Sequence, residues 1–332
     1  MEQVKQLLIL SSDVLFEHFF SQFARERLSQ VADWHLYSGR DESELSKKVQ
    51  AADILMTTWH TPFLKLEMFG PQLRVRLIAH CGGEVKSRME ERVVEHITVT
   101  NAAEPMAAPV AEMALALTLA LVRRIPNYAS EMNSGMVRTN EYVSHGETLR
   151  NRGVGLVGFG RIGQAFARLV APFTVNLLVS DPWASADAVA AAGGSLIDLD
   201  QLLSSSSIVV LAAALTSDSR HLLDQRRLAL LQDGAYLINV ARGGLIDLDA
   251  LLKELQSGRL SAALDVTDPL EPLPVDHELR RLPNVLLTPH IAAGGIEMRR
   301  EIGDVAVSEV VRFCKGEPLQ NVVTAEMLAT MT

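Results

Sequence analysis

The chain has few cysteines, few aromatic residues and no long run of basic residues. Only Cys81 and Cys314 occur among 332 residues, too few for a disulfide framework, which favours a reducing compartment. The formal net charge is −9 and no basic run exceeds two residues, as in Arg123-Arg124. Because nucleic-acid binding requires a basic face, we expect no nucleic-acid partner. We expect a cytoplasmic protein.

The sequence also lacks a hydrophobic run that we expect to cross a membrane. The N-terminal apolar run is short and is followed by serines and an aspartate, which is typical of a first buried strand and not of a signal peptide. The longest apolar stretch, 110–122, contains Glu112 and is shorter than the roughly 20 residues of a transmembrane helix. We therefore predict no membrane partner, and we assign no metal site.

What the sequence does contain is a long alternation of short apolar runs and helical segments, typical of parallel α/β sheets. With 332 residues, 48% of them hydrophobic, two domains are expected. A helix over 110–124, after Pro105 and Pro109, is predicted to connect the two series. The first series has predicted strands at 7–10, 34–37, 53–58, 75–80 and 97–100, and helices at 14–29, 42–50, 62–69 and 85–95. The second has apolar segments at 154–157, 176–179, 208–211, 236–240, 262–266 and 285–287. A polar excursion is expected at 125–152 and a last helix at 298–313.

The run GLVGFGRIG at 155–163 lies between the first predicted strand and helix of the second series. Here Gly158 permits a tight turn, Gly160 lets the backbone approach a pyrophosphate, and Gly163 lets the helix pack closely on its strand. N–H groups at the helix N-terminus then receive the phosphates. Asp181 follows eighteen residues later at the end of the next apolar run, where a carboxylate binds the adenosine ribose and favours NAD over NADP. The predicted cofactor-binding residues here are Gly158, Phe159, Gly160, Arg161, Ile162, Gly163 and Asp181.

Three later segments place charged residues at the ends of predicted strands: Arg242, Glu271 and His290. Carboxyl ends of parallel strands are where such sheets bind ligands. Reduction of a 2-keto acid requires a cation for the carboxylate and carbonyl oxygen, which Arg242 supplies. It also requires a proton donor, which His290 supplies, with Glu271 orienting the imidazole. Taken singly, the arginine is more typical of a surface ion pair and the histidine of a turn cap.

The segments around these residues resemble the NAD-dependent D-2-hydroxyacid dehydrogenase family. The resemblance rests on AYLINVARGGLIDLDALLKELQSGRL at 235–260, EPLP at 271–274 and LPNVLLTPHIAAG at 282–294, and on PVAEMALALTLAL at 109–121. It extends from about residue 78 to 323, whereas the earlier residues match in pattern only.

The resemblance implies a role for each matching residue. It makes Arg242 a substrate ligand, His290 the acid/base and Glu271 its partner. It implies that Asp265 contacts the nicotinamide carboxamide, and that backbone N–H groups near Gly82 and Gly83 hold the substrate carboxylate. The resemblance also implies that the cofactor is bound by Ala241, Arg242, Asp265 and His290.

The resemblance also implies the architecture: two Rossmann-like or flavodoxin-like parallel-sheet domains with the active site in the cleft between them. The C-terminal helix would return to the first domain, so that residues 1–107 and 291–332 form a substrate-binding domain and 108–290 an NAD-binding domain. A homodimer formed through the long helix and the 125–152 excursion is implied as well.

Several positions depart from the family pattern. Ala212 and Ala214 stand where His and Pro are usual, which predicts looser cofactor packing. One extra residue precedes Glu271, so that Asp268 competes as the histidine partner. The loop HCGGEVKS at 80–87 is unusual, as is Met106.

These departures leave the substrate acid open. Lys86 and His60 are either ligands of a second anionic substrate group or solvated surface residues. The activity that we predict is NAD(H)-dependent interconversion of a small 2-keto acid and a D-2-hydroxy acid. The alternative is an NAD(H)-binding sensor with little turnover, like the corepressor relatives of the family. A formate dehydrogenase would call for Gln at the position of Glu271.

Overall fold

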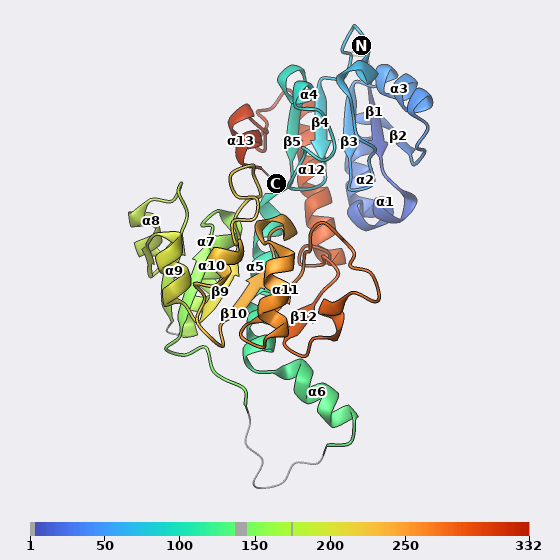
Figure 1. Ribbon diagram of the computed structural model, residues 1–332. Coiled ribbons are helices and arrows are strands. Elements are labelled where there is room, and N and C mark those ends of the chain that lie inside the picture. Colours follow the sequence, from blue (N-terminus) through green and yellow to red (C-terminus); the bar gives the residue numbers. More distant parts are fainter. Residues whose placement is uncertain (1–3, 137–144, 174, 332) are drawn as a thin grey trace. The chain divides into compact units, whose positions relative to one another are not determined.

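The computed structural model describes residues 4–136, 145–173 and 175–331, and it contains two parallel sheets of five and seven strands (Figure 1). The chain forms two compact units. The first comprises Met1–Met106 and Gly294–Thr332, and the second comprises Ala107–Ala293. The predicted fold class, two parallel-sheet α/β units, is confirmed.

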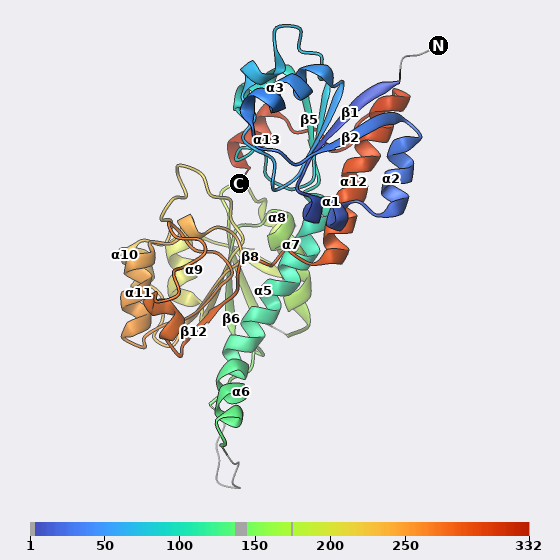
Figure 2. The ribbon, with the colours of Figure 1, turned by 90° about the vertical axis from the view of Figure 1, so that its right-hand side faces the viewer.

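The sheet of the first unit has the order β2-β1-β3-β4-β5, with all neighbouring strands parallel. Figure 2 shows α2 and α12 on one side of this sheet and α3 on the other. The strands are β1 (Lys5–Leu10), β2 (Ala32–Tyr37), β3 (Ile54–Thr57), β4 (Leu77–His80) and β5 (Thr98–Asn101). The helices are α1 (Asp13–Phe19), α2 (Gln22–Ser29), α3 (Glu42–Ala51), α4 (Glu91–His96), α12 (Ile296–Lys315) and α13 (Ala325–Thr330), with 3-10 turns η1 (Leu66–Phe69) and η2 (Glu104–Met106).

Three predicted helices of the first unit differ in the structure. Of the segment 62–69, only Leu66–Phe69 is helical, as the 3-10 turn η1. The segment 14–29 forms two helices instead of one, because the Ser21 side chain accepts the N–H of Ala24 at 3.1 Å and starts α2 there. The segment 85–95 is helical only from Glu91 onward. Before that point the Glu84 side chain accepts the N–H of Ser87 at 2.7 Å and fixes a turn.

The C-terminal part of the chain completes the first unit. Helix α12 packs against α1 so closely that a Cβ on Gly303 would lie 1.9 Å from the Phe19 carbonyl oxygen. The chain then returns to the sheet, where Val323 N–H donates to the Val99 carbonyl at 2.8 Å. The short helix α13 was not predicted from the sequence.

The sheet of the second unit has the order β12-β11-β10-β9-β6-β7-β8, again all parallel. Its strands are β6 (Gly153–Val157), β7 (Asn176–Ser180), β8 (Gly194–Leu196), β9 (Ile208–Leu211), β10 (Tyr236–Asn239), β11 (Ser261–Leu264) and β12 (Val285–Leu287). Its helices are α5 (Ala107–Val122), α6 (Ile125–Asn133), α7 (Arg161–Val170), α8 (Ala186–Ala191), α9 (Leu199–Ser205), α10 (Gln225–Leu228) and α11 (Leu248–Gln256). Its 3-10 turns are η3 (Ala171–Phe173), η4 (Gly243–Leu245) and η5 (Glu278–Arg281). Strand β8 was not predicted.

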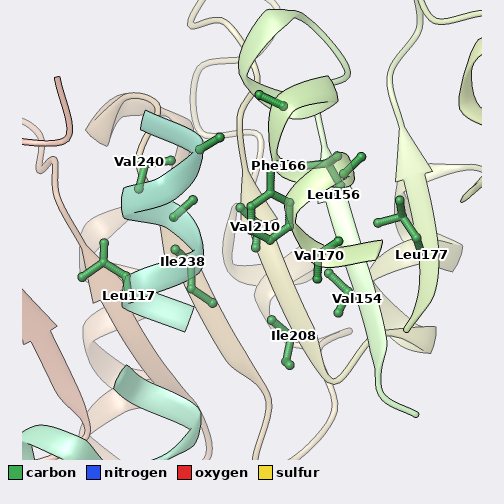
Figure 3. Close-up of a cluster of buried hydrophobic side chains, with 14 of the residues drawn as sticks. Leu117, Val154, Leu156, Phe166, Val170, Leu177, Ile208, Val210, Ile238 and Val240 are labelled. Atoms are coloured by element: carbon green, nitrogen blue, oxygen red, sulfur yellow. The ribbon is translucent and has the colours of Figure 1, made fainter. Parts of the chain in front are cut away.

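Both faces of this second sheet are buried. Successive strand residues point to opposite faces, so Ile208 and Val210 of β9 join one core while Val209 and Leu211 join the other. Helices α5 and α7 cover the first face, and α9, α10 and α11 cover the second. Figure 3 shows the first core, in which Phe166 of α7 lies among the strand side chains. This burial explains the continuous apolar runs of the sequence.

Helix α5 begins three residues before the predicted helix 110–124 and ends two residues before its predicted end. Pro109 lies in its first turn, where a missing N–H costs little, and η2 runs directly into it. The segment Glu104–Val122 has the length and composition of a membrane span, so the expectation that this stretch is too short was wrong. Buried core helices share that composition, and α5 packs on α7 and β10 within its unit. The following polar stretch contains α6, and its residues 137–144 lie outside the described residues.

Candidate active site

The glycine run forms a tight turn between β6 and α7. Gly158 has a φ of +96°, and a Cβ there would lie 2.5 Å from the backbone nitrogen of Ala213. A Cβ on Gly163 would lie 2.2 Å from the Gly158 carbonyl oxygen. At Gly160, which caps α7, no described atom lies within 4 Å of the Cβ position. The turn therefore has closely packed backbone behind it and an open side at Gly160, which suits the approach of a pyrophosphate.

Asp181 lies directly beside this turn, at the end of β7. One carboxylate oxygen accepts the N–H of Phe159 at 2.6 Å, and the other accepts the N–H of Trp183 at 2.7 Å. Each oxygen retains a lone pair for a further donor, so the carboxylate is fixed and still able to bind ribose hydroxyls. The residues of the turn thus fit an NAD dinucleotide. A surface depression of about 380 Å³ adjoins Asp181 and is lined by Ser180, Asp181, Pro182, Ala184, Leu196, Ile197, Asp198 and Leu199.

The three predicted catalytic residues come from one edge of the second sheet. Arg242 follows β10 and His290 follows β12, on either side of β11. Glu271 comes from the segment after β11, and its carboxylate is hydrogen bonded to His290 Nδ1. The two side chains are 37% and 49% exposed, so the pair is accessible to a ligand. With Nδ1 engaged, Nε2 is the ring atom left to exchange a proton with a substrate.

The geometry distinguishes Glu271 from its competitor Asp268. Asp268 pairs with Arg220, with Oδ2 and Nη1 3.0 Å apart. The segment before Glu271, which has one residue more than is usual, forms a turn in which the Leu270 carbonyl accepts the Thr267 hydroxyl at 2.6 Å. The Thr267 N–H donates to the second oxygen of Glu271 at 3.2 Å. The insertion therefore still leaves Glu271 in contact with His290.

Asp265 has a structural role that sequence analysis missed. It is 2% exposed and its carboxylate accepts three hydrogen bonds from the loop that carries His290. The donors are the Thr288 hydroxyl at 2.5 Å and the N–H groups of Ile291 and Ala292, each at 3.0 Å. The Asp265 carbonyl also accepts the N–H of His290 at 2.9 Å. Asp265 thus fixes the position of the histidine backbone, and its nicotinamide contact stays a prediction.

The main chain of Arg242 is held by the buried Asn239, which sequence analysis did not single out. The Asn239 amide donates to the Arg242 carbonyl at 2.9 Å and accepts the N–H of Ala241 at 3.0 Å. A polar residue at the end of an otherwise apolar strand is the signal that points to it. The Arg242 guanidinium donates to the Ala241 carbonyl at 2.8 Å.

In the first unit, the predicted carboxylate-binding loop starts directly after β4. A Cβ on Gly82 would lie 2.5 Å from His80 Nε2 and 2.8 Å from Trp59 Nε1, so a side chain at this position would have to displace these rings. The Gly83 carbonyl accepts the Asn101 amide at 2.8 Å. His80 is buried beside this loop, within 2.8 Å of the Thr57 hydroxyl, and burial lowers the pKa of its imidazole to about 3.

His60 and Lys86, which the sequence leaves as either ligands of a second anionic substrate group or surface residues, have different surroundings in the structure. His60 Nδ1 lies 3.4 Å from Nη2 of the exposed Arg40, and Lys86 is half-buried. Their contact with substrate stays a prediction. Within the described ranges, no group of three or more His, Cys, Asp or Glu side chains is placed to hold a metal ion.

Residues 115–292 match the family model described as D-isomer specific 2-hydroxyacid dehydrogenase, NAD binding domain. This chain belongs to that family. It is 30% identical to the glyoxylate reductase of Thermococcus litoralis over 92% of this chain and 93% of that protein. It is also 30% identical to the D-3-phosphoglycerate dehydrogenase of Methanocaldococcus jannaschii over 95% of this chain, but it spans only 59% of that protein's length. The TT0316 protein of Thermus thermophilus has the same fold, with a TM-score of 0.82 and 29% identity over 96% of this chain and all of that chain.

Membership of the D-isomer specific 2-hydroxyacid dehydrogenase family confirms the resemblance found in the sequence, and NAD as the cofactor. The matched region includes the glycine turn, Asp181, Arg242, Glu271 and His290. It does not include the Gly82–Gly83 loop, whose substrate contact stays a prediction.

Proposed function

We propose that this dehydrogenase interconverts a small 2-keto acid and the corresponding D-2-hydroxy acid with NAD(H). The observation that carries the proposal is the His290–Glu271 hydrogen bond on a loop anchored by buried Asp265. His290 and Arg242 lie at the same edge of the sheet. His290 can therefore donate a proton to the substrate to which Arg242 supplies a positive charge.

The residues divide the chemistry between them. Bound NADH supplies the hydride that goes to the keto carbon. Arg242 binds the substrate carboxylate and polarises the carbonyl, and His290 Nε2 gives its proton to the alkoxide oxygen as it forms. Glu271 accepts the Nδ1 hydrogen bond and holds the imidazole so that Nε2 is left for the substrate. In the opposite direction, neutral His290 removes the hydroxyl proton.

For the substrate, we propose an acid the size of glyoxylate or hydroxypyruvate. The glyoxylate reductase of Thermococcus litoralis aligns along nearly its whole length, whereas the D-3-phosphoglycerate dehydrogenase relative extends well beyond the match. The crowding of Trp59 and His80 over Gly82 favours a short substrate at the proposed carboxylate loop.

A panel of keto acids tests the proposal: glyoxylate, hydroxypyruvate, phosphohydroxypyruvate, pyruvate and bulkier acids, each followed by NADH oxidation. We expect turnover with the smallest acids. Arg242→Ala and His290→Ala should each lower kcat/KM by about 10²–10⁴-fold while NADH still binds. NADH binding without turnover of any acid would instead support the sensor alternative, and near-normal turnover in both variants would contradict the roles of these residues.

The setting of the protein is also part of the proposal. We propose a cytoplasmic homodimer without nucleic-acid or membrane partners. The net charge of −9 supports the absence of a nucleic-acid partner, and the two free cysteines support a cytoplasmic location. The side chains of Ile125 and Met132 in α6 are 55% and 57% accessible, which supports a partner surface on this helix. Light scattering after size-exclusion chromatography, with Ile125→Asp as the variant, would test the dimer.

A further inference from the structure

Among the described residues of the second unit, the most exposed aromatic side chain lies next to the predicted ribose-binding carboxylate. Trp183 is 84% accessible, although it follows Asp181 by only two residues. The other tryptophans, Trp34 and Trp59, belong to the first unit, where they contact phenylalanine rings. A large apolar ring left in water loses the free energy that its burial would provide. The exposed indole beside the predicted ribose-binding carboxylate is therefore available to a ligand at that site.

The backbone of Trp183 is fixed although its ring is exposed. Its N–H donates to one oxygen of Asp181 at 2.7 Å, and the other oxygen holds Phe159 of the glycine turn at 2.6 Å. The Asp181 carboxylate thus connects the backbone of Trp183 to the glycine turn, which is predicted to bind the pyrophosphate. Pro182 and Ala184, on either side of Trp183, line the depression beside Asp181. The indole is therefore carried on a rigid segment at the adenosine end of the predicted site.

We propose that Trp183 binds the adenine ring of NAD(H) by stacking its indole on the base. The proposal rests on the dinucleotide binding argued above and adds a residue outside the glycine turn. Stacking is suited to this position because a base has an apolar face that the exposed indole covers, whereas Asp181 contacts the ribose alone. Trp183 then contributes affinity for the adenosine half of the cofactor and takes no part in hydride or proton transfer.

Binding measurements with cofactor fragments test the proposal. Base stacking on an aromatic side chain predicts that Trp183→Ala weakens binding of NADH and of ADP-ribose by about ten- to a hundredfold. Trp183→Phe should retain most of the affinity, and nicotinamide mononucleotide should bind equally to all three proteins. Val275→Ala is the control, because Val275 is a 91% exposed apolar residue of the same unit outside the site. Calorimetry gives the dissociation constants.

A second measurement uses the intrinsic fluorescence of the tryptophan. ADP-ribose does not absorb tryptophan emission, so quenching on its addition requires contact with the indole. We expect wild-type emission to be quenched and Trp183→Phe emission to be unchanged at saturating ADP-ribose. Equal affinities of wild type and Trp183→Ala, or equal quenching in Trp183→Phe, would overturn the proposal. Failure of the wild type to bind NADH at all would instead refute dinucleotide binding itself.

Discussion

At the scale of single residues, Asp265 shows how one buried carboxylate positions a catalytic loop. Replacing it by Asn leaves an amide that accepts hydrogen bonds with only one of its two terminal atoms, so the part-buried N–H of Ile291 or the buried N–H of Ala292 loses its partner. An unpaired buried donor costs about 1–3 kcal/mol. We expect Asp265→Asn to lower the free energy of unfolding by that amount and to lower kcat as His290 shifts, as urea titration and steady-state kinetics would show.

Asp268→Asn is the matched control for this change. Asp268 belongs to the same segment, but its ion pair with Arg220 is exposed, with side chains 31% and 52% accessible. Exposed pairs contribute about 0–1 kcal/mol, so stability and kcat should change little. If both variants behave alike, the anchoring role of Asp265 is wrong.

His80 gives the stability of the protein a particular dependence on pH. Burial lowers the pKa of its imidazole to about 3 in the folded state, against about 6.5 in an unfolded chain. Above about pH 6.5 both states are neutral. As the pH falls further, only the unfolded state takes up the proton, so this group reduces stability by about 1.4 kcal/mol per pH unit until the pH approaches the folded-state pKa.

The free energy of unfolding is measured by urea titration. The measurements run from neutral pH down to about two pH units below the pKa of histidine in the unfolded chain. His80→Gln should show a shallower loss of stability on acidification than the wild type, because it lacks this proton uptake. His35→Gln is the control, since the His35 side chain is 69% exposed. Parallel pH profiles for wild type and His80→Gln would show that the buried imidazole does not behave in this way.

At the scale of elements, hydrophobic periodicity predicted most strands but not where helices break. The strand at 208–211 appears as predicted because both of its faces are buried, which leaves an uninterrupted apolar run. The half-buried edge strand at 285–287 also appears as predicted. The break at Ser21 depends on one side-chain hydrogen bond to a nearby N–H, which periodicity does not encode. At the site, the ends of the predicted strands indicated Arg242 and His290. The hydrogen bonds of Asp265 and Asn239 became visible only in the folded structure.

The crossing of α1 and α12 is another contact that the sequence alone does not reveal. In a helix interior, Gly→Ala normally stabilises by about 1 kcal/mol, but a Cβ on Gly303 would lie 1.9 Å from the Phe19 carbonyl oxygen. Overpacking costs typically about 1–3 kcal/mol, so we expect Gly303→Ala to lower the thermal midpoint. Gly295→Ala, where the Cβ position has no neighbour within 4 Å, should change it less. A rise in the midpoint with Gly303→Ala would contradict this close packing.

At the scale of the whole molecule, the nucleotide site and the proposed carboxylate loop belong to different units. The glycine turn, Asp181 and Trp183 all lie within Ala107–Ala293, whereas Gly82 and His80 lie within Met1–Met106. A ligand stabilises the structure that it binds, by about 2.7 kcal/mol at a hundredfold excess over Kd. NADH alone should therefore slow amide hydrogen exchange most strongly in the second unit.

Hydrogen exchange followed by mass spectrometry, with and without NADH, measures this effect. The largest protection is expected in peptides covering 155–164 and 178–184, where the backbone surrounds the predicted pyrophosphate and ribose sites. Oxalate added with NAD⁺, a combination that cannot transfer a hydride because oxalate has no C–H bond, should then extend protection to the peptide containing Gly82 and Gly83. Protection of that peptide by NADH alone, equal to that of the glycine turn, would contradict the division of binding between the two units.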